Sequence, residues 1–100
     1  MKFKTIIATV LIVSSQWASA DQGAALRSGC LGCHQIAVKT VGPAIQDIAK
    51  KFSPADIDQL VQTVKNGKDG DQLSWGSTPM PANAAPEADI RAALTWMLSQ

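Results

Sequence analysis

Both cysteines and the only histidine of this 100-residue chain fall within five consecutive residues, Cys30-Leu31-Gly32-Cys33-His34. The spacing C-x-x-C-H is the attachment motif of c-type haem. Two thiols three positions apart can each form a thioether with one vinyl group of the porphyrin, and the adjacent imidazole is then placed under the iron. The motif therefore predicts one covalently attached haem c per chain, bound through Cys30 and Cys33.

Three other kinds of site also use a pair of cysteines. A thioredoxin-like redox pair belongs to a strand-rich βαβ setting, and no segment of this sequence shows the period-two alternation of a strand. A structural zinc site needs about four protein ligands, more than two cysteines and one histidine provide. A plain disulfide would leave His34 without a role. We therefore favour haem attachment over these alternatives.

Residues 1–20 have the pattern of a secretory signal peptide. Two lysines precede an apolar run at residues 5–13, and Ala18-Ser19-Ala20 supplies a small-residue cleavage site. An uncleaved anchor would need about 20 apolar residues to span a bilayer, roughly twice the length of this run. We expect cleavage after Ala20, a mature domain of residues 21–100 in the periplasm, and no stable membrane insertion.

Removal of the signal peptide leaves seven basic and eight acidic residues, a formal net charge of −1. This balance gives no reason to expect a nucleic-acid partner, and it is a poor match to an anionic membrane surface. A single domain of 80 residues obtains only a few kcal/mol from its own core unless a cofactor, metal or disulfide reinforces it. The size of the chain thus agrees with a fold that needs a haem.

Helical periodicity dominates the mature sequence. Large apolar residues recur at i, i+3, i+4 and i+7 in three stretches, at residues 45–52, 54–66 and 86–100. A shorter helix is expected at residues 22–28, with Asp21 as its N-cap. Ser53 and Gly67 mark the two ends of the second stretch, whereas Pro86 offers no side-chain acceptor to cap the last. The sequence predicts an all-α fold of about four short helices around the haem.

Only one histidine exists, so the sixth iron ligand must be another residue type. Once the signal peptide is removed, Met80 and Met97 are the thioether candidates. Met97 falls on the apolar stripe of the last helix and is interpreted as a core residue. Met80 lies in Pro79-Met80-Pro81 within a loop rich in Gly, Ser and Pro, where the prolines stiffen the backbone on either side. We predict His34 and Met80 as the axial ligands.

This ligand pair predicts an electron carrier and not an enzyme, because a six-coordinate iron has no open position for a substrate. A haem enzyme or ligand sensor with a labile Met80 is the alternative from another class, but nothing in the sequence provides an acid or base beside the iron. The expected partners are redox proteins, such as a membrane cytochrome complex, a terminal reductase, an oxidase or a periplasmic dehydrogenase. A carrier dedicated to one of these would differ in partner and not in chemistry.

Six short motifs follow one another along the mature chain: Gly29–His34, Val41–Ala44, Lys65–Gly67, Trp75-Gly76, Pro79–Pro81 and Leu94–Ser99. In this order they resemble the small bacterial class I cytochromes c of the c-551 type. The resemblance implies that the Pro43 carbonyl accepts the Nδ1 hydrogen of His34. It also implies that Trp75 hydrogen-bonds a haem propionate and that Asn83 supports the Met80 sulfur. Simple packing of Trp75 and a turn-forming role of Asn83 are the alternatives.

The two terminal helices show one agreement with this family and one departure from it. Trp96 is interpreted as a structural residue that packs the last helix against the first. The family has a bulky residue about one turn before the first cysteine, whereas this chain has Ala24 and Ala25 and leaves only Leu26 in that region. We therefore expect a looser contact between the two helices.

Overall fold

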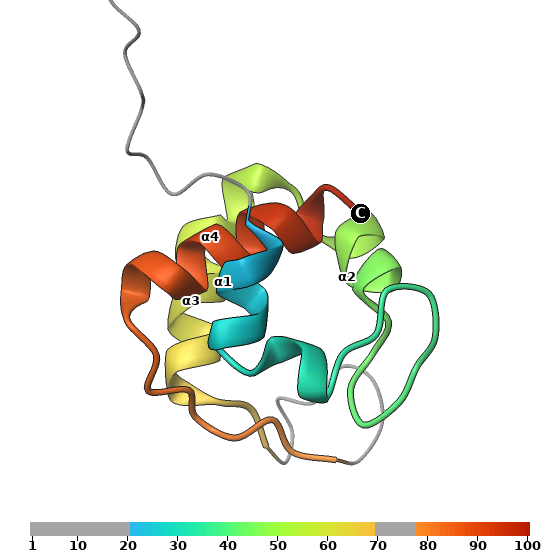
Figure 1. Cartoon of the computed structure of the whole chain (residues 1–100), viewed down its shortest axis with the longest axis horizontal. Helices are drawn as coiled ribbons and strands as arrows, with labels where there is room; N and C mark the ends of the chain where they lie inside the picture. Colours follow the sequence, from blue (N-terminus) through green and yellow to red (C-terminus); the bar gives the residue numbers. More distant parts are fainter. Residues whose placement is uncertain (1–20, 70–77) are drawn as a thin grey trace, which may run out of the picture.

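The computed structural model describes residues 21–69 and 78–100 of the chain. Their elements are α1 (Gln22–Arg27), the 3-10 helix η1 (Cys30–Gly32), α2 (Ile45–Lys51), the 3-10 helix η2 (Pro54–Asp56), α3 (Ile57–Asn66) and α4 (Glu87–Leu98). Figure 1 shows their order along the chain. Within these residues no strand forms, and Lys68 and Met80 pair as an isolated β-bridge. The predicted all-α fold is confirmed.

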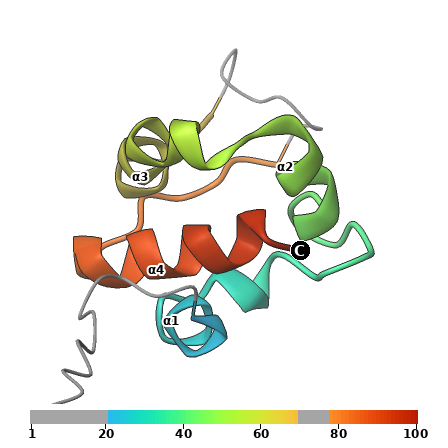
Figure 2. The same cartoon turned by 90° about the horizontal axis from the view of Figure 1, so that it is seen from above.

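Helix α4 lies between α1 on one side and α3 on the other (Figure 2). Its contact with α3 is made by large apolar side chains, since Leu60, Val61 and Val64 of α3 cluster with Ile90 and Leu94 of α4. All five side chains are buried. Burial of each such side chain contributes roughly 1.5–3 kcal/mol, so this contact is the main apolar core of the described residues.

The contact between α1 and α4 is made by small side chains. Ala24 and Ala25, both 0% exposed, cluster with Ala92 and Ala93 of α4, and Trp96 packs against the same group. The role predicted for Trp96 is confirmed. The looser contact expected from the alanines is wrong, because side chains this small let the two helix backbones approach closely enough to bury both alanines completely.

The helix ends agree with the capping signals of the sequence. Asp21 caps α1 through its carboxylate, and the Asp56 carboxylate accepts a hydrogen bond from the Ser53 N–H at 2.8 Å where η2 begins. Helix α3 ends at Gly67, and Pro86 begins α4 without a side-chain cap. The second predicted helix differs only in its first turn, which is a 3-10 helix.

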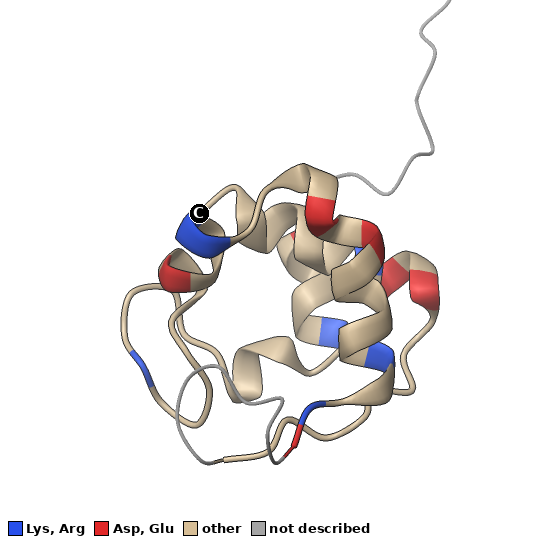
Figure 3. Ribbon diagram, turned by 180° about the vertical axis from the view of Figure 1, so that it is seen from behind, with Lys and Arg blue, Asp and Glu red and all other residues tan. Residues whose placement is uncertain are grey.

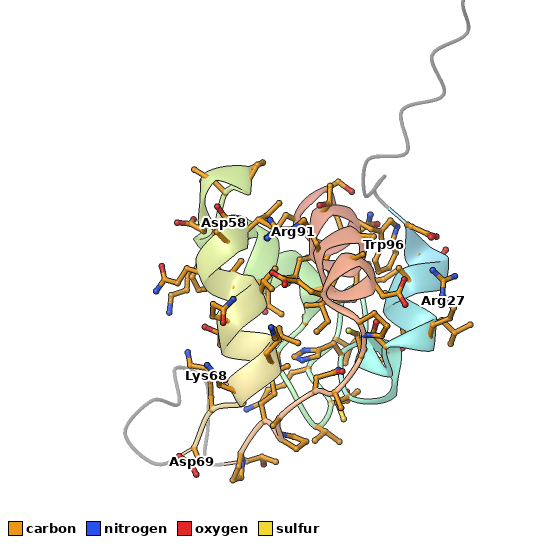
Figure 4. The ribbon with its side chains drawn as sticks, turned by 90° about the vertical axis from the view of Figure 1, so that its left-hand side faces the viewer. Arg27, Asp58, Lys68, Asp69, Arg91 and Trp96 are labelled. Atoms are coloured by element: carbon orange, nitrogen blue, oxygen red, sulfur yellow. The ribbon has the colours of Figure 1, made fainter. Side chains whose placement is uncertain are left out.

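Charged residues follow the helix dipoles. Figure 3 shows acidic segments where α3 and α4 begin, in agreement with Asp58, Glu87 and Asp89 in their first turns. Arg91 of α4 reaches Asp58 of α3 at 2.6 Å on the exposed side of the helix pair (Figure 4). None of the described helices is long and apolar enough to span a bilayer.

Candidate haem site

The two predicted attachment residues lie on the short turn that follows α1. Gly29 turns the chain in the left-handed region, with φ of 76°, and η1 then presents Cys30. The Cys30 carbonyl accepts a hydrogen bond from the His34 N–H at 3.0 Å, which ties the motif into one compact turn. Both thiols are free. Burial raises the pKa of the Cys30 thiol above its ordinary value.

His34 is held in one orientation by backbone groups. The side chain is buried, at 8% exposure, and its Nδ1 lies 2.8 Å from the Pro43 carbonyl oxygen. Because a carbonyl can only accept, Nδ1 carries the hydrogen and Nε2 keeps its lone pair for a metal. The contact that the resemblance implied between these two residues is thus present in the structure.

Gly42 gives the His34 ring the space that this orientation requires. A Cβ at position 42 would lie 2.5 Å from His34 Cε1 and 2.8 Å from Nδ1, closer than real Cβ contacts. Sequence reasoning assigned no role to Gly42, although a glycine directly before the predicted histidine partner is the signal that could have revealed it. The Cys33 carbonyl fixes this loop by accepting hydrogen bonds from the Gly42 N–H at 2.8 Å and the Thr40 hydroxyl at 2.9 Å.

Met80 is positioned by the residues at the end of α3. Its N–H donates to the Lys68 carbonyl and its carbonyl accepts from the Lys68 N–H, both at 2.8 Å. The Met80 side chain is half-buried and packs against the apolar core between α3 and α4. The segment around Met80, residues 79–82 (the methionine segment), is therefore attached to α3. Residues 30–34 (the cysteine segment) are attached to α1.

Asn83 connects these two segments. Its Nδ2 donates to the Ser28 carbonyl at 2.8 Å, two residues before Cys30, and its Oδ1 accepts from the Ala85 N–H at 2.9 Å. The hydrogen bond to Ala85 closes a local turn, which is the turn-forming role given above as the alternative for Asn83. Because Nδ2 carries a second hydrogen, the predicted support of the Met80 sulfur stays a prediction.

The predicted site residues line one cavity of about 600 Å³. Six of the seven are among its walls: Cys30, Cys33, His34, Pro43, Met80 and Asn83. The seventh, Trp75, lies outside the described residues. Most of the remaining wall is apolar, and it includes the core residues Leu60, Leu94 and Met97. A cavity of this size and lining is typical of a cofactor pocket, which spans roughly 300–1,000 Å³.

The chemistry of the walls fits a covalently bound haem. Two free thiols, an imidazole with an available Nε2 and a thioether sulfur line the same apolar cavity. The Ser28 hydroxyl in the same wall is buried and has no hydrogen-bond partner among the described residues. Cysteine thiols, a histidine imidazole and a methionine thioether are the groups that attach and ligate a c-type haem.

Known proteins that are similar to this chain are cytochromes c. A family model described as Cytochrome c matches residues 20–100. Cytochrome c-552 of Nitrosomonas europaea is 38% identical over 95% of this chain and 91% of its own length, and cytochrome c-551 of Allochromatium vinosum is 45% identical over 81% and 86%. The crystal structure of the Nitrosomonas protein covers 79% of this chain and 98% of its own, with a TM-score of 0.69 and 36% identity.

Proposed function

We propose that this chain, which belongs to the cytochrome c family, is a periplasmic carrier that shuttles single electrons between redox proteins with its iron ligated by His34 and Met80. Membership of the family establishes a covalently attached haem c and an electron carrier rather than an enzyme. The ligand pair, the location and the partners are the parts that we propose. The observation that carries the proposal is the single cavity onto which both cysteines, His34 and Met80 converge.

Different residues of this cavity would attach the cofactor, orient its ligand and set the stability of its reduced state. The bound haem supplies the one-electron couple. Cys30 and Cys33 retain the group, and the Pro43 carbonyl fixes the tautomer of His34, so that Nε2 is the ligating atom. Met80 supplies a soft thioether, and together with burial in an apolar pocket such a ligand favours the reduced state of the iron.

The test of the ligand pair is the absorption spectrum of the ferric holoprotein. Wild type is expected to show the charge-transfer band of a methionine bound to iron, and Met80→Ala is expected to lose it and to bind carbon monoxide readily when reduced. Met97→Leu is the matched control, because Met97 lines the same cavity but belongs to the core, at 4% exposure. A band that persists in Met80→Ala, or disappears in Met97→Leu, contradicts the assignment.

The proposed location rests on the signal pattern of residues 1–20, which lie outside the described residues. Cleavage after Ala20 gives a mature protein that begins at Asp21. The mass of the purified holoprotein is then expected to equal that of residues 21–100 plus one haem. A mass that includes residues 1–20 contradicts this part of the proposal.

The proposed partners are redox proteins, such as a membrane cytochrome complex, a terminal reductase, an oxidase or a periplasmic dehydrogenase. The loop between η1 and α2 exposes the apolar side chains of Ile36, Val38 and Val41, by 39%, 63% and 54%. Val41 also lines the haem cavity. An apolar surface beside the cofactor suits a small and transient contact, which supports docking of a partner at this edge.

A further inference from the structure

The end of α3 binds the methionine segment through main-chain atoms. Lys68, just after the helix, forms two hydrogen bonds with Met80, each of 2.8 Å. One turn earlier, the Val64 carbonyl accepts a hydrogen bond from the Asn83 N–H at 3.0 Å. Figure 4 shows Lys68 where the chain leaves α3. The position of the methionine segment is thus set by the backbone of α3.

Gly67 lies at the centre of this contact. Its φ of 77° and ψ of 176° fall in a region that essentially only glycine adopts. A Cβ at position 67 would lie 2.6 Å from the Met80 carbonyl oxygen, 2.7 Å from the Ala82 nitrogen and 3.0 Å from the Pro81 carbonyl carbon. All three are backbone atoms, which cannot rotate away as the end of a side chain can. Any other residue here would therefore displace residues 80–82.

We propose that Gly67 is a positioning residue for the iron, because its missing side chain lets Met80 sit close enough to α3 for the sulfur to ligate. This inference rests on the proposed ligation by His34 and Met80. Pro79 and Pro81 flank the methionine, and their fixed φ limits how far the segment can bend locally. A displacement at Gly67 is therefore transmitted to Met80 instead of being absorbed between them.

The experiment is a titration of ferric holoprotein with imidazole, a ligand that competes with Met80 for the iron. Gly67→Ala is expected to bind imidazole at least about tenfold more tightly than wild type, which corresponds to about 1.4 kcal/mol. The methionine–iron charge-transfer band is expected to weaken in the same variant before any imidazole is added. A merely structural role of Gly67 would lower the free energy of unfolding without changing either quantity.

A control separates the contact from its effect on stability. Ile90 is buried in the core between α3 and α4 and is not in the cavity wall, so Ile90→Val tests the effect of lost stability. This variant is expected to keep the imidazole affinity of wild type. A tenfold rise in this control would overturn the proposal.

The titration also distinguishes failure of this inference from failure of the ligand assignment. If Met80→Ala binds imidazole more tightly than wild type but Gly67→Ala does not, ligation by Met80 stands and the role of Gly67 is wrong. If Met80→Ala and wild type bind imidazole equally, the ligand assignment itself is wrong. If Gly67→Ala yields no holoprotein, Pro81→Gly is the second variant. It loosens the backbone beside Met80 at an exposed position and is expected to raise the imidazole affinity. Unchanged affinity in Pro81→Gly would likewise overturn the proposal.

Discussion

At the residue scale, the orientation of His34 depends on two neighbours that contribute only backbone. The Pro43 carbonyl holds Nδ1 at 2.8 Å, and Gly42 leaves the ring room on one side. Neither a main-chain acceptor nor a glycine can change rotamer, so the His34 imidazole has little rotational freedom. Such pre-orientation is what a ligating histidine receives from its surroundings in metal sites generally.

Gly42→Ala is expected to lower the free energy of unfolding of the holoprotein by about 1–3 kcal/mol, the usual cost of an added methyl group in a packed site. The physical reason is the 2.5 Å approach of the new Cβ to His34 Cε1. Guanidinium unfolding followed by haem absorbance measures the change. Gly32→Ala is the matched control, since among the described residues no atom beyond the chain neighbours lies within 4 Å of a Cβ at position 32. Equal stabilities of the two variants would contradict the role of Gly42.

The sequence predicted the site residues whose chemistry is visible in their type and spacing. Cys30, Cys33 and His34 follow from one motif, and Met80 follows from the absence of a second histidine and from its flanking prolines. The role of Gly67 was not predictable in the same way. Its importance arises from atoms about thirteen positions along the chain, and only the folded backbone brings them together.

At the element scale, the short helix α1 depends on its first residue. The Asp21 carboxylate accepts a hydrogen bond from the Gly23 N–H at 2.8 Å and lies 3.4 Å from the Arg27 guanidinium. The first contact satisfies a helix N–H that would otherwise lack a partner, whereas the second joins exposed groups and contributes little. Since α1 carries the chain directly to Cys30, its N-cap helps to order the attachment segment.

Asp21→Ala is expected to lower the free energy of unfolding by about 0.5–2 kcal/mol, the usual effect of losing an N-cap. Asp21→Asn keeps a side-chain oxygen for the Gly23 N–H but removes the charge that faces Arg27, so it should retain most of the stability. Denaturant unfolding of both holoproteins tests this order. An asparagine variant as unstable as the alanine variant would assign the effect to the ion pair.

Helix positions were predictable because periodicity and caps are local, whereas helix contacts were not. The ends of α3 and the weak cap of α4 follow from Ser53, Gly67 and Pro86. The close contact between α1 and α4 does not, because alanines give no periodic signal of their own. Whether Ala24 and Ala25 make a loose or a close contact depends on the small residues that face them, Ala92 and Ala93.

At the scale of the whole molecule, charge and exposed apolar surface together set how closely two redox proteins approach. Residues 21–100 carry a formal net charge of −1 before any cofactor is counted, so the protein part adds little long-range repulsion between two copies. Val38 and Val41 expose apolar side chains on the loop between η1 and α2, and Val41 also lines the cavity. We propose that redox proteins meet this chain through that loop.

Electron self-exchange between oxidised and reduced copies of this protein tests that surface without an identified partner. Because the two reacting proteins are identical, the reaction has no driving force. A substitution that shifts the midpoint potential therefore does not change the driving force of self-exchange. Val38→Asp places like charges opposite each other when two copies meet through this loop. The self-exchange rate is then expected to fall at least about fivefold, as for a repulsion of about 1 kcal/mol between charges in contact.

Line widths in nuclear magnetic resonance spectra of mixed oxidation states give this rate. Leu26→Asp is the control, because Leu26 is 67% exposed on α1 and does not line the cavity. High salt screens exposed charges, with a Debye length of about 3 Å at 1 M, and is expected to restore much of the rate in Val38→Asp. If Leu26→Asp slows self-exchange as much as Val38→Asp does, electrons leave the molecule through a different face.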